Sequence, residues 1–333
     1  MSSFVDGAVV RREFDDFDGL GTAFASWELQ AARIDGGPFA ARFDMAMTTE
    51  MQIARLRVSS GLLITGATPR GAGGAGLISS ASSGIRSLGR SIDPVINAPA
   101  RLRQSETHFL SNGPFDLTVI GVEEALFARH LSVRLYEEAT RQGTDWLLRA
   151  PAGTANCPER ACAINSLLSV LSSNAAASRQ VKHRLQECVL QILLEGLETY
   201  GSSTPVVSSS TRRRVARAAE ELLRARLDEP PSLLELCEAL NVPERTLHAA
   251  FQEGFGMSPK TYLRSLRLSA AHMRLRSGAG SVTDTATELG FFHFGRFSSE
   301  YRTMFGEPPS ETLRRARGLS TIQNSELAAK ARQ

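Results

Sequence analysis

The sequence predicts an α+β protein, with a β-rich amino-terminal part that also contains helices and an all-helical carboxy-terminal part. Three observations support this. Short segments in which apolar and polar residues alternate lie between Gln30 and Val122. Two copies of one pattern, an apolar helix, a tight turn and a second helix, lie between Ser232 and Leu313. A polar stretch, GSSTPVVSSST, separates the two parts. Alternation with period two is typical of half-buried strands, and spacings of three and four are typical of helices.

The alternating segments predict short strands in the amino-terminal part. Charged and apolar residues interleave in FAARFDMAM and MQIARLRVSSGLLITG, and FDLTVIGV at 115–122 follows. Spaced aromatic residues precede them, and glycine and proline punctuate them.

The run GAGGAG at 71–76 matches the GxGxxG pattern of dinucleotide sites, but its surroundings do not fit one. Such a site needs a strand directly before the run, a helix directly after it and an acidic residue about twenty positions on. Here Thr-Pro-Arg precedes the run, and a Ser/Gly-rich stretch follows it to Gly84. We therefore interpret 71–76 as a flexible loop and expect no cofactor.

Apolar residues at helical spacing predict three helices, at 123–141, 158–172 and 178–200. The third helix is expected to bury one stripe of residues, either in the core of the same chain or at the face of a homodimer, and the pattern leaves both alternatives open. The stripe consists of Val181, Leu185, Cys188, Val189, Ile192 and Leu193.

The cysteines and histidines do not indicate a metal or catalytic site. Cys157, Cys162, Cys188 and Cys237 form no CxxC pair and have no histidine at ligand spacing, so we interpret them as reduced, buried thiols. No nucleophile elbow, phosphate-binding loop or HExxH motif occurs, and nothing favours an enzyme. No apolar run reaches the length of a membrane span, and the amino terminus lacks a secretory pattern, so we expect a cytoplasmic protein.

The two turns of the helical part have a physical reason. Asn241 and Gly290 stand between the paired helices, where the backbone must enter the left-handed region that glycine adopts freely and asparagine tolerates. Pro243 is expected in a first helical turn, where its missing N–H has no helical partner anyway. A helix at 260–277 connects the units, and Ser232 and Ser281 are expected to cap helix starts.

With these features, the region from Ser232 to Leu313 resembles the DNA-binding domain of AraC/XylS-type transcription regulators. The wording GFFHFGRFSSEYRTMFGEPPSETL is closest to the branch that resembles regulators of ethanolamine and aromatic-catabolism operons. The sequence departs from the family pattern at Asn241, Ala249 and Thr285. The matching positions are Leu236, Cys237, Leu240, Leu247, Phe251, Gly256, Ser258, Pro259, Tyr262, Arg267, Leu268, Ala271, Ala286, Gly290, Phe291, Phe297, Tyr301, Phe305, Gly306, Pro308 and Pro309.

The resemblance implies a domain organisation. We expect an effector-binding and dimerisation domain at 1–200, cupin-like in fold, and an interdomain linker at 201–211. A double helix-turn-helix domain at 212–318 and a flexible tail at 319–333 follow. The 124 residues from Ser210 onward hold 19 Lys/Arg and 14 Asp/Glu, a net of +5, while the whole chain is only +3. An acidic-leaning front and a basic back suit a sensor joined to a DNA-binding domain.

The resemblance also implies a function. It is that of a sequence-specific transcription regulator, an activator that answers to a small-molecule effector and binds promoter DNA as a homodimer beside RNA polymerase, in the cytoplasm at the nucleoid. One alternative is a DNA-binding protein whose amino-terminal domain only dimerises. Another is a repair protein with a similar module, which would show a reactive cysteine among metal ligands; Cys157 and Cys162 lack such companions.

The second helix of each unit, at 243–253 and 292–302, is expected to enter a major groove. Outward positions on these helices are the candidate DNA-binding residues. They are Arg245, Thr246, His248, Ala249 and Gln252 in the first unit, and His293, Phe294, Gly295, Arg296 and Ser299 in the second.

Overall fold

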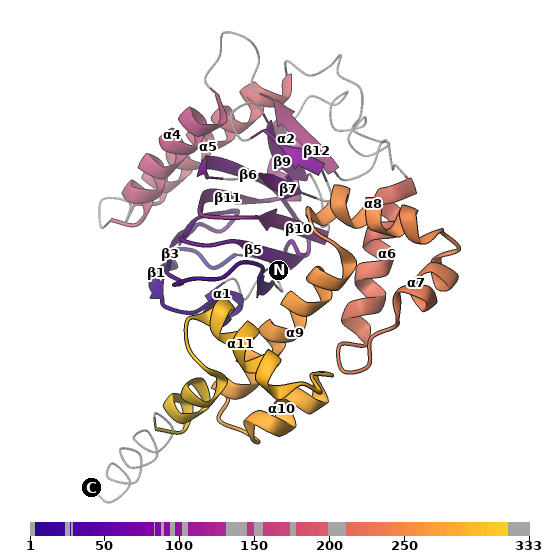
Figure 1. Cartoon of the computed structure of the whole chain (residues 1–333). Helices are drawn as coiled ribbons and strands as arrows, with labels where there is room; N and C mark the ends of the chain where they lie inside the picture. Colours follow the sequence, from indigo (N-terminus) through magenta and orange to yellow (C-terminus); the bar gives the residue numbers. More distant parts are fainter. Residues whose placement is uncertain are drawn as a thin grey trace, which may run out of the picture. The chain divides into compact units, whose positions relative to one another are not determined.

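A computed structural model of the 333-residue chain confirms the predicted α+β fold (Figure 1). The structure describes residues 4–23, 27, 29–82, 84–87, 90–93, 97–101, 106–130, 145–149, 156–173, 178–198 and 211–318. Contacts divide the chain into two units, one of residues 1–31 and 39–210 and the other of residues 32–38 and 211–333. The expected linker positions 201–210 and the tail 319–333 lie outside the described residues, and Thr211 already belongs to a helix.

The first unit is built on two sheets whose strand pairs are antiparallel wherever the register is described. The seven-stranded sheet has the order β1-β3-β4-β11-β6-β9-β12, and the five-stranded sheet the order β2-β5-β10-β7-β8. The strands are β1 (Val9–Phe14), β2 (Gln30–Arg33), β3 (Ala41–Met47), β4 (Met51–Val58), β5 (Leu62–Ala67), β6 (Ala72–Ala81), β7 (Ile85–Ser87), β8 (Arg90–Ile92), β9 (Asn97–Arg101), β10 (Glu106–Ser111), β11 (Phe115–Glu123) and β12 (Asp145–Arg149).

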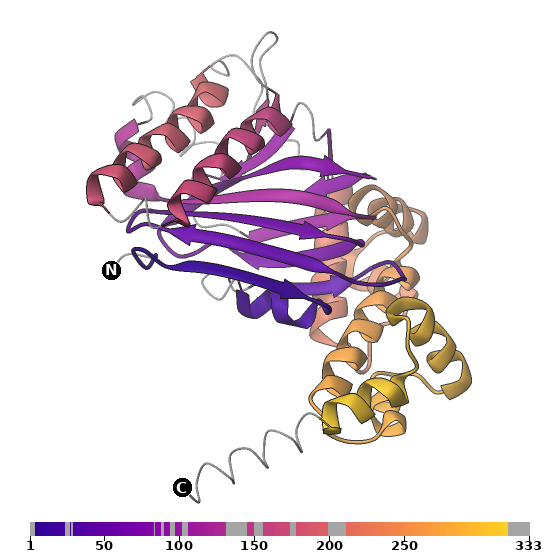
Figure 2. The same ribbon diagram turned by 90° about the vertical axis from the view of Figure 1, so that its left-hand side faces the viewer.

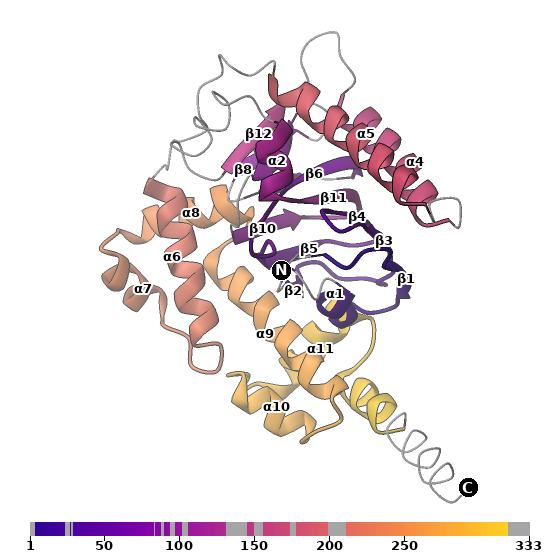
Figure 3. The same cartoon turned by 180° about the vertical axis from the view of Figure 1, so that it is seen from behind.

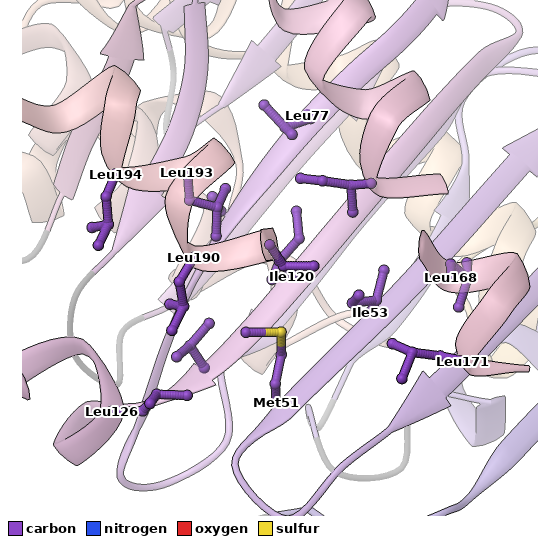
Figure 4. Packing of buried hydrophobic residues seen from close by; sticks show 14 of the residues in the cluster. Met51, Ile53, Leu77, Ile120, Leu126, Leu168, Leu171, Leu190, Leu193 and Leu194 are labelled. Carbon is purple, nitrogen blue, oxygen red and sulfur yellow. The ribbon is translucent and has the colours of Figure 1, made fainter. Parts of the chain in front are cut away.

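Two helices, α4 (Cys157–Leu171) and α5 (Arg179–Glu198), lie side by side over one face of the seven-stranded sheet (Figure 2). Leucines of both helices pack against Met51, Ile53 and Ile120 of the central strands (Figure 4). The shorter helices α1 (Asp18–Ala23) and α2 (Glu124–His130) complete the described part of the unit.

The predicted strands are confirmed, but the central ones are buried on both faces and not half-buried as expected. Ile53 and Ile120 face the helices, while Leu56 and Leu117 point to the opposite side of the sheet and line a cavity. On the helix side Arg55 of β4 donates to Asp116 of β11 at 2.6 Å, so an ion pair bridges the two strands. Of the expected helix at 123–141, α2 occupies the beginning, and residues 131–141 lie outside the described part of the chain.

The interpretation of the glycine run at 71–76 as a flexible loop was wrong. Gly71 lies in the turn before β6, and the residues from Ala72 onward belong to β6, a strand paired with β11 on one side and β9 on the other. A Cβ atom at Gly74 would stand 2.4 Å from the carbonyl oxygen of Ile120, so only glycine allows the two strands this approach. The close approach of β6 and β11 therefore accounts for the glycine at position 74.

The expectation of uniformly buried thiols was also wrong. Cys162 and Cys188 are exposed, and Cys237 is half-buried. The buried stripe of α5 includes Val189 and Leu193 as expected, together with Leu190 and Leu194. The expected Val181, Leu185 and Ile192 are partly buried against it, and only Cys188 faces outward. That stripe belongs to the core of the same unit, because it packs on the sheet.

In the second unit, every regular element of the described residues 211–318 is a helix (Figure 3). Its helices are α6 (Thr211–Ala225), α7 (Leu233–Leu240), α8 (Glu244–Phe255), α9 (Pro259–Arg276), α10 (Val282–Glu288) and α11 (Phe294–Phe305). A further helical segment at 309–318 follows α11. No described helix of either unit is both long and apolar enough to cross a membrane.

Truncation of Phe297 tests the core of the second unit. This ring is 1% exposed and packs 4.9 Å from the ring of Phe291, between centroids. Phe297→Ala is expected to lower the free energy of unfolding by about 3–5 kcal/mol, because it leaves a cavity in a packed core. Both tryptophans, Trp27 and Trp146, lie in the first unit. Urea unfolding should therefore shift in far-ultraviolet circular dichroism and not in tryptophan fluorescence.

The matched control is Phe294→Ala on the same helix, where the side chain is 45% exposed. This change should alter stability by less than about 0.5 kcal/mol. Equal destabilisation by both substitutions would show that α11 does not turn Phe297 inward and Phe294 outward.

Candidate nucleic-acid interface

The first helix-turn-helix consists of α7 and α8. Ser232 caps α7: its hydroxyl accepts the Glu235 N–H at 3.2 Å, and the Glu235 carboxylate accepts the Ser232 N–H at 2.6 Å. Backbone and side-chain hydrogen bonds from Ser232 lower the pKa of Glu235. Asn241 ends α7 with φ of 50° and ψ of 50°, the left-handed conformation expected from the sequence. Pro243 then directly precedes α8.

The second helix-turn-helix consists of α10 and α11. Ser281 caps α10, since its hydroxyl accepts the Asp284 N–H at 3.0 Å. Gly290 makes the turn with φ of 72°, and the next N–H, that of Phe291, donates to the carbonyl of Ala286 at 2.8 Å. The chain therefore reverses within a few residues before α11 begins.

Gly290 is required by crowding as well as by its backbone angles. A Cβ atom there would lie 2.6 Å from a terminal nitrogen of Arg267, a residue of α9. The Arg267 side chain is held in place because its Nε donates to the Leu227 carbonyl at 3.1 Å. Arg267 thus connects α9, the segment after α6 and the turn of the second helix-turn-helix.

The helix α9 is fixed at its amino-terminal end by a buried polar group. The hydroxyl of Tyr262 donates to Glu220 of α6, and Arg224 donates to the same carboxylate oxygen at 3.0 Å. Tyr262 is 1% exposed and Glu220 5% exposed. Burial, together with the neighbouring Glu220 carboxylate, raises the pKa of Tyr262 well above its usual value. Tyr262 is therefore a neutral donor at any physiological pH.

At its carboxy-terminal end α9 is fixed to α11. Nδ1 of the buried His272 lies 2.6 Å from the Tyr301 hydroxyl, which donates to the Thr312 hydroxyl at 2.9 Å. Thr312 in turn donates to Glu307 at 2.6 Å. Since each hydroxyl has only one proton, this chain of donors leaves His272 Nδ1 as the donor to Tyr301. The network joins α9, α11 and the segment after α11.

The candidate residues of the first helix-turn-helix lie on the outer side of α8. Arg245 and Gln252 are exposed, and Thr246, His248 and Ala249 are half-buried, whereas Leu247 between them is fully buried. Nε2 of His248 lies 3.6 Å from Glu244, one turn earlier on the same helix.

The candidate residues of the second helix-turn-helix are all exposed, and they lie at the start and in the first half of α11. They are His293, Phe294, Gly295, Arg296 and Ser299. The expected helix at 292–302 begins later than predicted, because Phe294 is its first residue and His293 its cap. Phe292, which the helical pattern placed inside the helix, lies in the preceding turn and is 75% exposed. The pattern contained no signal that this ring is exposed, since aromatic residues usually indicate core positions.

Arg296 is oriented by a carboxylate on its own helix. Its Nε donates to Glu300 at 2.8 Å, and the same oxygen of Glu300 accepts from Arg264 of α9 at 3.4 Å. The bond to Glu300 uses Nε, so within the described part of the chain it leaves the two terminal nitrogens of Arg296 for another acceptor. That is the fork that contacts guanine bidentately.

Comparison with known proteins supports the helix-turn-helix assignment. A family model described as a helix-turn-helix domain matches residues 236–315. The chain is 40% identical over 105 residues to the XylDLEGF operon transcriptional activator 1 of Pseudomonas putida, which covers 31% of this chain and 30% of that protein. It is 31% identical over 109 residues to the HTH-type transcriptional activator RhaS of Pectobacterium carotovorum subsp. carotovorum (strain PC1), covering 33% of this chain and 39% of that protein.

Among solved structures, the chain is similar to a probable AraC family transcriptional regulator from Rhodopseudomonas palustris CGA009. The identity is 38%, the TM-score is 0.30, and the match covers 31% of this chain and 97% of that one. The chain spans only 30% and 39% of the lengths of the two curated relatives named above.

Gly290→Ala tests the turn of the second helix-turn-helix. A side chain here must adopt φ of 72° and displace the guanidinium of Arg267. The free energy of unfolding is expected to fall by about 1–2 kcal/mol from the backbone conformation alone. Thermal unfolding followed by circular dichroism measures the loss.

Gly295→Ala is the matched control, because no atom lies within 4 Å of the Cβ position in the first turn of α11. This change should not destabilise the protein and should gain up to about 1 kcal/mol, the difference in helix propensity between the two residues. A loss at Gly295 as large as that at Gly290 would contradict the described turn.

Proposed function

We propose that this chain is a sequence-specific DNA-binding transcription regulator of the AraC/XylS type that acts as an activator. The observation that carries the proposal is the arrangement of two helix-turn-helix units on one helix, α9. Each unit presents an exposed arginine on its second helix: Arg245 on α8 and Arg296 on α11. The match of residues 236–315 to a helix-turn-helix domain supports it.

The dimensions of the helical unit suit duplex DNA. At 18 residues, α9 is about 27 Å long, and successive major grooves on one face of DNA lie about 34 Å apart. Because α8 packs near the start of α9 and α11 near its end, the two second helices can enter neighbouring major grooves. One protomer would then cover an asymmetric site of about two helical turns.

The proposed roles follow from side-chain chemistry. Arg245 and Arg296 would contact guanine O6 and N7, His248 would donate to an acceptor edge, and the methyl of Ala249 would contact thymine. The cap of α11, His293, stands at a helix start whose N–H groups favour phosphate. The remaining proposed contacts are Thr246, Gln252, Phe294, Gly295 and Ser299.

The first unit is proposed to bind a small-molecule effector between its two sheets. A cavity of about 60 Å³ lies there, lined by apolar side chains from both sheets, among them Ile64, Phe109 and Leu117. Thr107 also lines it, and its Oγ1 is buried with no hydrogen-bond partner among the described residues. An apolar cavity with a few polar groups is typical of small-molecule sites. The chemistry favours a small neutral molecule with an apolar body and one hydroxyl.

The further assignments are part of the same proposal. The wording of the last helix-turn-helix and the 40% identity to an operon activator support the branch that resembles ethanolamine-operon and aromatic-catabolism regulators. We propose an effector-binding and dimerisation domain at 1–200 and a DNA-binding domain at 212–318. The protein would act as a homodimer beside RNA polymerase at the nucleoid. The competing function is a DNA-binding protein whose first unit only dimerises.

Arg296→Ala tests whether the second helix-turn-helix contacts a base. After selection of the preferred site from a pool of random duplexes, this variant should lose about 1–3 kcal/mol of binding free energy at that site. It should also tolerate other bases at one position. Arg245→Ala should do the same about one helical turn away. The measurement is binding to all single-base variants of the site at two salt concentrations.

Arg302→Ala is the control for Arg296, since Arg302 is exposed on the same helix and is not among the proposed contacts. It should leave the base preferences unchanged. A uniform loss for Arg296→Ala on all sequences, with the salt slope reduced by about one, would assign Arg296 to a phosphate contact instead.

Thr107→Val tests the effector cavity. Phenols and small aromatic alcohols need the cavity to widen from 60 Å³ toward the roughly 150 Å³ that holds a benzene ring. If the two sheets give way in this manner, such probes should raise the melting temperature of the whole protein, because a ligand that binds only the folded state stabilises it by mass action. Removing the Thr107 hydroxyl at nearly constant volume should weaken the binding of such a probe about ten-fold, the usual net value of one buried hydrogen bond. Calorimetric titration of both proteins measures the difference.

Thr65→Val is the matched control on the neighbouring strand. Thr65 pairs with His108 rather than with Thr107, and it does not line the cavity. Affinity for the probe should be unchanged. Failure of every probe to shift the melting temperature would favour the alternative in which the first unit only dimerises.

A further inference from the structure

Two aromatic rings at the start of α11 are exposed. Phe292 is 75% exposed and Phe294 is 45% exposed, although both belong to a unit with a well-packed aromatic core. Large apolar side chains are normally buried, and neighbouring exposed ones mark a surface that binds something.

The local structure holds these rings outside the core. The turn at Gly290 directs Phe291 inward, where its ring packs 4.9 Å from the ring of Phe297. The five residues between these two anchors, 292–296, are all exposed. The middle of this stretch is open, because no atom lies within 4 Å of the Cβ position of Gly295. The rings are therefore presented by the fold and are not a consequence of fraying.

The surrounding charge favours a polyanion as the partner. The sequence from Leu289 to Ser299 contains no acidic residue, while His293 and Arg296 stand beside the two rings. The carboxylate that comes next, Glu300, is hydrogen-bonded to Arg296 at 2.8 Å. A surface with an arginine, exposed rings and no uncompensated carboxylate is complementary to DNA, whose phosphates are anionic.

Within a major groove the base edges offer one apolar group, the C5-methyl of thymine. An exposed phenyl ring on a helix in that groove has no other apolar surface to contact. The position of the rings, in and just before the first turn of α11, is where a recognition helix contacts base edges.

We propose that Phe292 and Phe294 determine part of the sequence specificity by packing against the methyl groups of thymines in the site of the second helix-turn-helix unit. This inference rests on the proposed function, and it names which bases the second helix-turn-helix recognises besides the guanine assigned to Arg296. The preferred half-site contains at least one thymine beside that guanine.

The test removes the methyl group and nothing else. The site preferred by the whole protein is first selected from random duplexes, and each thymine in the half bound by the second unit is then replaced by deoxyuridine. The intact protein should lose about four-fold in affinity at one or two positions, the value expected for one buried methyl group. For Phe294→Ala or Phe292→Ala, replacement at the corresponding position should make no further difference.

Two variants serve as controls. Leu234→Ala removes an apolar side chain that is 68% exposed on α7, and it should keep full sensitivity to deoxyuridine. Phe294→Leu retains an apolar group and should keep part of that sensitivity. Melting curves check that each variant is folded, which the exposure of both rings leads us to expect.

The outcomes separate this inference from the proposed function. If no sequence is enriched from the random pool, the proposed function fails and the inference with it. If a site is enriched but deoxyuridine has no effect, or both phenylalanine variants keep the full effect, thymine recognition is overturned while DNA reading stands. Normal binding of both variants combined with lost transcription in a purified system would assign the rings to a protein partner and overturn the proposal.

Discussion

The hydrogen bond from the buried Tyr262 hydroxyl to Glu220 fixes α9 against α6, and the arrangement of the helical unit depends on it. A carboxylate that is only 5% exposed is costly unless its charge is compensated, and Arg224 provides this at 3.0 Å. At the other end of α9, His272 and Tyr301 form the equivalent connection through a chain of hydroxyl donors. Because both ends are fixed, the separation of α8 and α11 is a property of the folded unit. A reader of two successive grooves requires this, since a variable spacing would lose affinity to conformational entropy.

Buried anchors determine where the exposed candidate residues stand. On α8 the fully buried Leu247 lies between Arg245 and the half-buried His248, so its packing sets the orientation of both. On α11 Phe297 has the same role for Arg296. The exposed face of each second helix is thus decided by apolar contacts behind it, and a change in the core would alter recognition without touching a candidate residue.

Glycine is used in two different ways in the two units. At Gly74 the backbone is extended, and the constraint is the nearby carbonyl of Ile120 in the next strand. At Gly290 the constraint is a φ of 72° and the guanidinium of Arg267. The second use was visible in the sequence, because a turn between two apolar helices needs a left-handed residue. The first was not, because a close approach between strands depends on a neighbour more than forty residues away.

The sequence alone determined the α+β class, the strands at 39–66 and 115–122, the caps at Ser232 and Ser281, and the two helix-turn-helix units. These follow from local periodicity and from hydrogen bonds between residues three or four apart, which a pattern records directly. Only the tertiary structure decided that the glycine run is a strand, that Cys188 is exposed and that Phe292 stands outside the helix. The first two depend on which surface a distant segment covers, and the third on where the turn at Gly290 lets α11 begin. A periodic pattern specifies that a face is apolar, but burial requires a partner, and the partner is supplied by the fold.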